Sequence, residues 1–413
     1  MLFRIIGYTG TAGVLRLAVG LVSQKVIAVF LGASGLAILA NLRSLIEVLG
    51  TFSSVGAQNG IISQTASSES KASVRALLNT TITLFLGASL LIGVLVFWQH
   101  EWLAFTLQID LKYGALVQAV AFTIPFMGMM ILLEAVLSGK KAFKYVSKVQ
   151  LFTASVTAIL MVILLFYYGL LGALIALLYR PIIGFVFYLY HYKKATLPVS
   201  FFAGFKFDLS RFKDLLPYIF MSLLAVGLVH IVEIYLRGLI ASRIDLQSAG
   251  LWTAMNTISS NYFVFVSAVF SLYVLPRYSE KTSSFHLLQE VKSILKTLLP
   301  IVSVAMILVY LFRAPITTLL YSIDFTSITT LFKWQLTADW VRVIFLVFGY
   351  YLVAKKRLID YIIVELFSFS TLIGLSLYWI DTFGIEGIVM ANAVRYLGCL
   401  VLVVLLLRKK LVN

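Results

Sequence analysis

Seven cationic side chains lie inside long apolar stretches of this sequence, where charged groups are rare. A cation at the centre of a membrane span costs about 2.5 to 3.5 kcal/mol on insertion scales, so these side chains are expected to face protein or water. Guanidinium groups bind phosphate oxygens in a bidentate manner. The pattern predicts a cationic cavity for an amphiphile with a phosphate or diphosphate head group. The seven residues are Arg16, Lys25, Arg43, Arg180, Arg237, Arg342 and Arg395.

Three of these cations have an acid one helical turn away in the sequence. The pairs are Arg43 with Glu47, Arg237 with Glu233, and Arg342 with Asp339. Side chains three or four residues apart are neighbours on a helix, so structural ion pairing and ligand binding are equally good interpretations for these three cations. The other four have no carboxylate within four residues. They need a partner from another helix or an anionic ligand.

Polar side chains also share helix faces, which suggests that the helices enclose one water-filled cavity. Arg43, Glu47, Ser54 and Gln58 fall within about 60° of one another at helical spacing. A second predicted span aligns His230, Glu233 and Arg237, and a third carries an uncharged stripe that includes Asn256. Hydrogen bonding between helices is the simpler role for any single Ser, Thr or Asn. The stripes together predict a polar cavity.

The balance of charge inside the spans favours an anionic ligand. Seven cations face five acids there, whereas a transporter for cationic drugs would be expected to have an anionic cavity. The fifth acid is Glu134, and the other four, together with His230, are candidates for coupling to protons or Na⁺, with neutralisation of nearby arginines as their simpler role. The coupling candidates are Glu47, His230, Glu233, Asp339 and Glu365. No cofactor and no metal site is expected.

The elements that position these residues are transmembrane helices. Of 413 residues, 61% are hydrophobic and 12% are charged, and the mean hydropathy is +1.00, outside the range of soluble domains. The formal charge of +16 would suggest nucleic acid in a soluble protein. Here the cations lie mostly at the ends of apolar runs, so no nucleic-acid partner is expected. The lone Cys399 excludes an intrachain disulfide.

Twelve apolar windows of about the length needed to span a bilayer follow one another along the chain. The first runs to about Phe30 and is expected to be a span, not a cleaved signal peptide. A basic, Phe-rich linker at 193–213 suits the head-group region and separates an N-terminal six-helix lobe, 1–192, from a C-terminal one, 214–413. The windows are 5–31, 36–64, 74–98, 113–137, 146–168, 170–190, 215–241, 249–275, 288–312, 329–353, 359–380 and 385–407.

The connections between windows predict the orientation. One side collects 22 Lys and Arg residues, and the opposite side has only Lys112, Arg243, Arg313 and Lys333. Because cationic loops resist translocation, the basic side is cytoplasmic, and both termini are expected there. Gly35-Leu36 with Asn41, and Gly250-Leu251 with Asn256, occupy equivalent windows in the two halves, which is typical of transporters built from repeats.

Three stretches make the sequence resemble a known group of membrane proteins. They are KVIAVFLGASGLAILANLRSLIEVLGTFSSVGAQNG from Lys25, SLYVLPRYSE from Ser271, and FKWQLTADWVRVIFLVFGYYLVAKKRLIDYIIVE from Phe332. They resemble Wzx-type polysaccharide flippases, which handle O-antigen or enterobacterial common antigen lipid intermediates. These belong to the multidrug/oligosaccharidyl-lipid/polysaccharide exporter superfamily. The resemblance implies an all-α inner-membrane protein with two six-helix lobes, a central cavity and alternating access.

The resemblance also implies a substrate and a set of site residues. The substrate would be an undecaprenyl-diphosphate-linked oligosaccharide, and partners would include membrane lipids and a polymerase and chain-length regulator of the same pathway. Residues in the matching stretches are assigned to the cavity; Arg16, Arg180, Arg237, Asn256 and Arg395 are assigned from the charge and polarity arguments alone. An ion-coupled drug antiporter and a membrane glycan polymerase remain alternatives, although long external loops for sugar chemistry are lacking. The residues assigned to the cavity from the matching stretches are Lys25, Asn41, Arg43, Asn59, Trp334, Gln335, Asp339 and Arg342.

Overall fold

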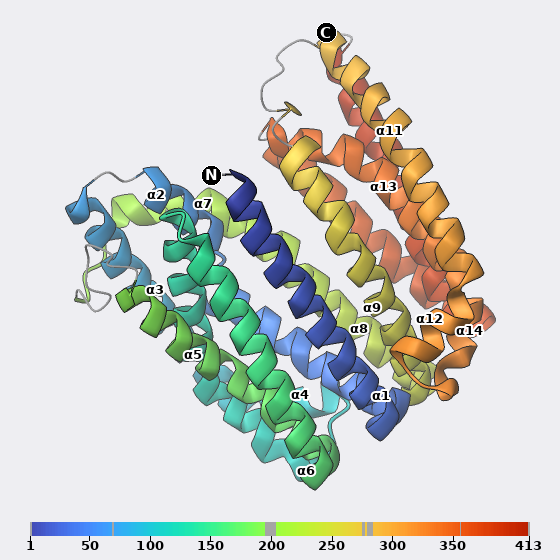
Figure 1. The fold of residues 1–413 in the computed structure, drawn as a ribbon, viewed down its shortest axis with the longest axis horizontal. Coiled ribbons are helices and arrows are strands. Elements are labelled where there is room, and N and C mark those ends of the chain that lie inside the picture. The colour runs from blue at the N-terminus through green and yellow to red at the C-terminus, as the bar shows by residue number, and fades with distance from the viewer. Residues whose placement is uncertain are drawn as a thin grey trace. The chain divides into compact units, whose positions relative to one another are not determined.

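Helices make up the regular structure of the chain. The structure is a computed structural model that describes residues 2–67, 70–194, 204–274, 277–278, 284–355 and 357–411. Those residues contain α-helices with short 3₁₀ and π segments and no strand, which confirms the all-α prediction (Figure 1). Part of the predicted linker, 195–203, lies outside the described residues.

Two compact units divide the chain, one formed by residues 1–31 and 38–234 and the other by 32–37 and 235–413. The division into lobes at the linker 193–213 stays a prediction. The first unit contains, in whole or in part, α1 (Leu2–Ser53), α2 (Gln58–Ser67), α3 (Lys71–Trp98), α4 (His100–Thr106), η1 (Leu111–Tyr113), α5 (Gly114–Gly139), α6 (Phe143–Lys194), α7 (Leu209–Ser222), η2 (Leu223–Gly227) and α8 (Leu228–Arg243). The second contains α9 (Leu246–Val269), η3 (Phe270–Val274), α11 (Ser284–Leu311), α12 (Arg313–Leu320), η4 (Ile323–Thr330), α13 (Phe332–Ala354) and α14 (Leu358–Leu411).

Three of the longest helices are each two helices joined at a glycine. Gly32 in α1, Gly169 in α6 and Gly384 in α14 have φ of 65°, 58° and 57°, a left-handed conformation that favours glycine. Each begins a G-x-x-G motif. In the second motif a Cβ on Gly172 would lie 1.9 Å from the Leu164 carbonyl oxygen, so the second glycine allows the two helices to meet closely. The motif therefore marks a reversal of the chain.

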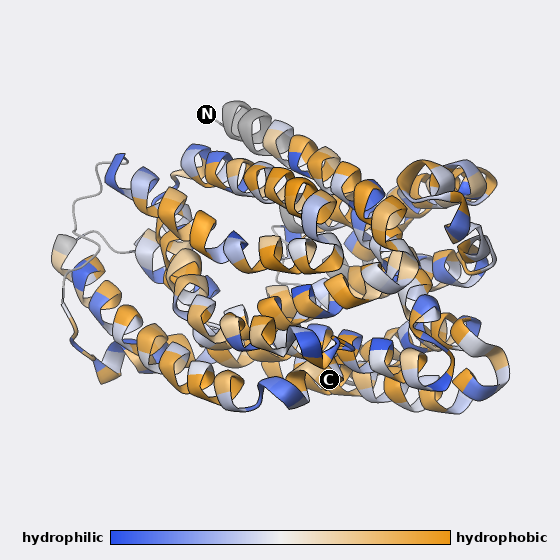
Figure 2. Cartoon of the chain, turned by 90° about the horizontal axis from the view of Figure 1, so that it is seen from below, coloured by the Kyte–Doolittle hydropathy of each residue, from blue (hydrophilic) through white to orange (hydrophobic). Residues whose placement is uncertain are grey.

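Membrane spans follow from these helices. Seven helices among the described residues are long and apolar enough to cross a membrane, and the three kinked ones are 43 to 52 residues long, about twice one span. If each kink separates two spans, and if the more polar segments α7–α8 and α9–η3 also cross, the number is twelve. That number and the cytoplasmic position of both termini remain predictions. Hydrophobic residues line the helices, and hydrophilic ones gather mainly near helix ends and turns (Figure 2).

Each unit has its own buried core and a lipid-facing surface. In the first unit α5 packs against α3 and α6, burying Phe85, Leu132 and Tyr188 almost completely. In the second, α13 packs on α14 around Val364, and Cys399 is buried there. Because lipid tails are as apolar as these side chains, packing and polar contacts must hold the helices together. The polar contacts are therefore informative about the site.

Candidate functional site

A polar pocket of about 340 Å³ lies inside the first unit, among otherwise apolar helices. Its polar lining comes from both halves of α1, from α2, α5, both halves of α6, and α7. Two arginines and two carboxylates face it, together with amides and hydroxyls. The polar residues are Arg16, Glu47, Thr51, Ser54, Gln58, Asn59, Glu134, Gln150, Thr153, Arg180, Tyr188 and Ser222.

The predicted second span is broken in two, and the second piece contributes Gln58 and Asn59 to the pocket. The sequence predicted one helix over 36–64, but α1 ends at Ser53 and α2 begins at Gln58. Val55 and Gly56 between them have φ of 50° and 66°. The expected continuous stripe is therefore wrong as a helix face, because the backbone turns within it. Glu47, Ser54 and Gln58 nevertheless line the same pocket.

Glu134 is the centre of a hydrogen-bond network at this pocket. The Tyr188 hydroxyl donates to Glu134 Oε2 at 2.7 Å, and Gln150 Nε2 donates to Oε1 at 3.0 Å. Arg16 Nη1 in turn donates to Gln150 Oε1 at 2.7 Å. The Gln150 amide thus connects a guanidinium to a carboxylate across three helices. This arrangement fixes the Arg16 guanidinium at the pocket.

The second arginine of the pocket pairs with a carboxylate. Arg180 Nη1 lies 3.3 Å from Glu47 Oε1, and both side chains are about two-fifths exposed, at 41% and 42%. The sequence offered Arg180 no acid nearby, so its partner from another helix is the simpler of the two expected outcomes. An ion pair between groups this exposed contributes little to stability.

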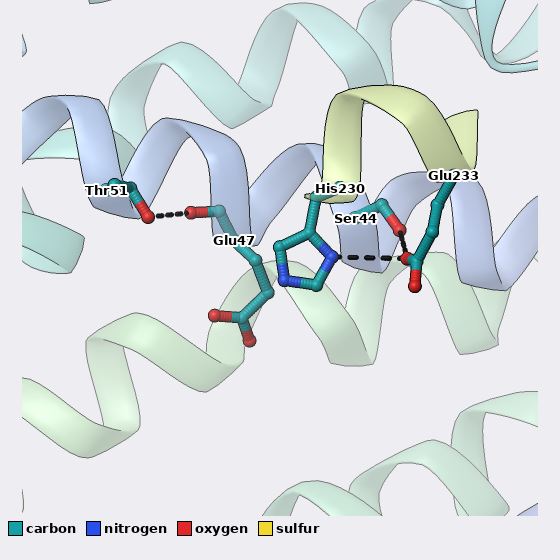
Figure 3. A network of polar contacts seen from close by, with 5 residues as sticks. All are labelled: Ser44, Glu47, Thr51, His230 and Glu233. Atoms are coloured by element: carbon teal, nitrogen blue, oxygen red, sulfur yellow. Dashed lines mark hydrogen bonds and ion pairs between the residues drawn. The ribbon is translucent and has the colours of Figure 1, made fainter. Parts of the chain in front are cut away.

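Two of the predicted coupling residues, His230 and Glu233, contact each other. His230 Nδ1 lies 3.2 Å from Glu233 Oε2, and the Ser44 hydroxyl donates to the same oxygen at 3.1 Å. In the view of Figure 3 the His230 ring lies between the side chains of Glu47 and Glu233. Arg237, one turn further along α8, is 4% exposed and belongs to the second unit. The predicted alignment of His230 with Glu233 on one helix face is confirmed.

Lys25 and Arg43 lie on the two halves of α1. The non-helical residue between them is Gly32, seven residues after Lys25 and eleven before Arg43. At 1.5 Å per residue, Arg43 lies about 6 Å further along its helix from Gly32 than Lys25 does. Lys25 is partly buried and Arg43 exposed. Asn41 is buried and donates to the Leu107 carbonyl oxygen at 2.9 Å, a contact between the second half of α1 and the C-terminal end of α4.

Asp339 forms a separate polar centre in the second unit. Its side chain is fully buried on α13, and its Oδ2 accepts hydrogen bonds from Ser259 Oγ at 2.6 Å, from Gln335 Nε2 at 3.1 Å and from the Tyr262 hydroxyl. Oδ1 is buried without a hydrogen-bond partner. The sequence paired Asp339 with Arg342, but three neutral donors serve this carboxylate.

The arginines of the second unit contact aromatic rings. The Arg342 guanidinium lies 4.0 Å from the Phe263 ring centroid, and that of Arg395 lies 4.2 Å from the Tyr396 centroid. Such cation–π contacts are stronger when water is excluded. Trp334 has Lys333 Nζ 4.7 Å above its ring. Asn256 and Glu365 are partly buried in the same unit.

Sequence reasoning missed Gln150 and Tyr188 and gave Glu134 no role beyond its charge. Gln150 and Tyr188 lie on α6, 38 residues apart, and both reach Glu134 on α5. A signal was present, since Glu134 is an acid inside an apolar run that has no cation within four residues. An unexplained carboxylate inside a membrane span marks a functional site as much as an unexplained cation does.

Comparison with known proteins identifies the family. The profile described as "Polysaccharide biosynthesis protein" matches residues 26–330, about three quarters of the chain. The chain belongs to this family. Among curated relatives, this chain is 28% identical to the lipid III flippases of Escherichia coli (strain K12) and Shigella flexneri, over 94% of this chain and 94% of each relative. The predicted family resemblance is confirmed.

Solved structures share the fold of this chain. An inward-facing multidrug resistance MATE family transporter of the MOP superfamily matches with a TM-score of 0.81 and 13% identity, covering 96% of this chain and 94% of that one. The lipid II flippase MurJ in an inward closed conformation matches with 0.75 and 15%, covering 97% and 87%. The chain is a multi-pass protein of the bacterial inner membrane with the fold of these transporters.

Proposed function

We propose that this protein is a flippase that moves an undecaprenyl-diphosphate-linked oligosaccharide from the cytoplasmic to the periplasmic leaflet. Its membership in the polysaccharide biosynthesis family, with two lipid III flippases as relatives along nearly the whole chain, carries the proposal. The protein is accordingly a transporter and not an enzyme. The glycan is an O-antigen or enterobacterial common antigen repeat unit.

The pocket of the first unit supplies chemistry that suits such a head group. Arg16 and Arg180 offer guanidinium donors for phosphate oxygens or acidic sugars, and Asn59 and Gln58 offer amides for sugar hydroxyls. Binding would replace the weak Arg180–Glu47 pair with a multiply charged anion. The prenyl chain can stay in the bilayer while the head group crosses by alternating access. Lys25 and Arg43 are further candidates for the diphosphate.

An ion-coupled antiporter for small molecules is the second candidate. The polar pocket contains Glu47 and Glu134, and the related fold of a multidrug transporter favours this reading. The two arginines in the same pocket argue against a purely cationic substrate. Coupling to protons or Na⁺ through Glu47, His230, Glu233, Asp339 and Glu365 is compatible with either function.

The test is transport of the lipid-linked oligosaccharide itself. In cells with equal membrane levels of each variant, we expect Arg16→Gln and Arg180→Gln to accumulate cytoplasm-facing lipid-linked oligosaccharide. Arg243→Gln is the matched control. Arg243 is half-exposed and pairs with Asp381, and both residues belong to the second unit, away from this pocket. Purified protein in proteoliposomes should expose the same lipid on the opposite leaflet. Export of a cationic dye without movement of the lipid would overturn the proposal in favour of the antiporter.

A further inference from the structure

A groove of about 390 Å³ runs between α11 and α13 in the second unit. Residues of Ser303–Tyr310 line one wall and residues of Lys333–Trp340 the other. Trp340 Nε1 donates to Ser303 Oγ at 2.9 Å, which joins the two helices at one end. Tyr310 and Lys333 each lie seven residues away from that contact, so they lie at the opposite end of the groove, about 10 Å along two antiparallel helices.

The groove lies on a lipid-facing surface. Around it α11 exposes Ile301, Val304 and Leu311, at 65%, 59% and 64%. The groove itself is lined by Met306, Ile307 and Leu336 at its centre. In a membrane such a surface is covered by hydrocarbon chains. Because any chain leaves one apolar environment for another, burial alone cannot select the lipid that occupies the groove.

Two cations at the Tyr310 end can make that selection. Lys333 is exposed at the first turn of α13. Arg313 donates from Nη1 to the Tyr310 carbonyl oxygen at 2.8 Å, and its guanidinium lies 4.3 Å from the Tyr310 ring centroid. On the predicted periplasmic side the loops contain only four cations, and these are two of them. A lysine and an arginine at the mouth of an apolar groove match a lipid with a strongly charged head.

We propose that this groove binds the carrier lipid in the outer leaflet, with the head-proximal part of its prenyl chain between α11 and α13 and its diphosphate at Lys333 and Arg313. This inference rests on the proposed function and adds a second, product-side site to it. The groove covers about one third of a hydrocarbon core of about 30 Å. A diphosphate carries more charge than the single phosphate of an ordinary phospholipid, so two cations favour it over the bulk membrane.

Photo-crosslinking tests the occupant. A benzophenone amino acid replaces Ile307, which lines the groove, or Val304, which faces lipid outside it. The full chain is placed in vesicles of phosphatidylethanolamine and phosphatidylglycerol that contain undecaprenyl diphosphate. We expect several-fold more prenyl adduct at 307 than at 304, and a several-fold loss in the combined Lys333→Gln, Arg313→Gln variant. Lys112→Gln, a cation of the same predicted side in the other unit, should change nothing.

Two results would overturn the groove site. Equal adduct at 307 and 304 would mean that prenyl chains only diffuse past, and phosphatidylglycerol adducts that undecaprenyl diphosphate does not displace would assign the groove to ordinary phospholipid. Flipping of the lipid-linked oligosaccharide separates this failure from that of the proposed function. If the protein flips the lipid but forms no more prenyl adduct at 307 than at 304, only the groove site is rejected. If it forms more adduct at 307 but does not flip the lipid, only the proposed function is rejected.

Discussion

Glu47 of α1 forms an ion pair with Arg180 of α6 at 3.3 Å, although Arg43 lies one helical turn from Glu47 on the same helix. The two residues are 133 positions apart in the sequence, and their pair joins α1 to α6 at the wall of the polar pocket. Its role, structural or ligand-binding, is open to a direct experiment.

Removing both charges distinguishes these roles. Arg180→Gln should reduce transport by about tenfold, equivalent to about 1.4 kcal/mol, and Arg180→Lys should lose less because it keeps the charge but not the fork. We expect the double variant Arg180→Gln, Glu47→Gln to remain impaired, because the guanidinium is needed by the substrate. Recovery of normal transport in the double variant would reduce Arg180 to a structural counter-ion.

Tyr188→Phe tests the network around Glu134. The change removes one donor at 2.7 Å from a side chain that is 2% exposed. Hydrogen bonds between membrane helices contribute about 0.6 kcal/mol on average and up to about 1.7, and a carboxylate acceptor places this one near the upper value. Thermal unfolding in detergent should show the loss. Tyr190→Phe, at an exposed site on the same helix, is the control; equal stability of both variants would contradict the prediction.

Gly172→Ala should damage folding, although alanine has a higher helix propensity than glycine. A Cβ at this position would lie 1.9 Å from the Leu164 carbonyl oxygen, which belongs to the backbone and cannot move aside cheaply. Overpacking of this kind costs about 1 to 3 kcal/mol or more. The amount of folded protein in the membrane should fall. Gly87→Ala has no atom within 4 Å of the new Cβ and should be tolerated; similar levels of both variants would mean that the kink can relax.

Reporter fusions test the orientation. Reporters after Asn413 and within 67–73 should be cytoplasmic, and those within 99–112 periplasmic, because the basic loops resist translocation. Alkaline phosphatase and a fluorescent protein read the two sides. Opposite locations of the two termini would require an odd number of spans and would reject the twelve-span prediction.

The helices could be predicted from the sequence, because a backbone in lipid must satisfy its hydrogen bonds internally and long apolar runs become helices. The glycines at 32, 169 and 384 fall between predicted windows, and the structure turns there. The break at Val55 and Gly56 was missed, since an apolar window continues through it and only the backbone angles reveal the turn.

The site was predictable only in part. Charges without a nearby acid in apolar runs singled out Arg16 and Arg180, and both line the pocket. Their partners were not predictable, because spacing on one helix says nothing about which residue another helix brings near. Gln150 is the clearest case, since an amide in a membrane span is an ordinary helix contact until Arg16 and Glu134 are seen on its two sides.

Asp339 offers the sharpest test of ion coupling. The carboxylate is fully buried, three neutral donors share Oδ2, and Oδ1 has no hydrogen-bond partner. An acceptor atom in that position is suited to take up a proton, so we expect transport to depend on pH through Asp339. Asp339→Asn keeps one carbonyl oxygen for the three donors and replaces Oδ1 with an uncharged NH₂ group that cannot take up a proton.

Asp339→Asn should therefore fold normally, transport about tenfold more slowly and lose the pH dependence. Asp339→Ala leaves Ser259, Tyr262 and Gln335 without their common acceptor and should also lower the unfolding temperature. Initial rates in proteoliposomes between pH 6 and pH 8, with and without Na⁺, measure the effect. Asp381→Asn, an exposed acid paired with Arg243, is the control. If Asp339→Asn keeps the wild-type pH profile, the carboxylate is a structural acceptor and the coupling ion binds elsewhere.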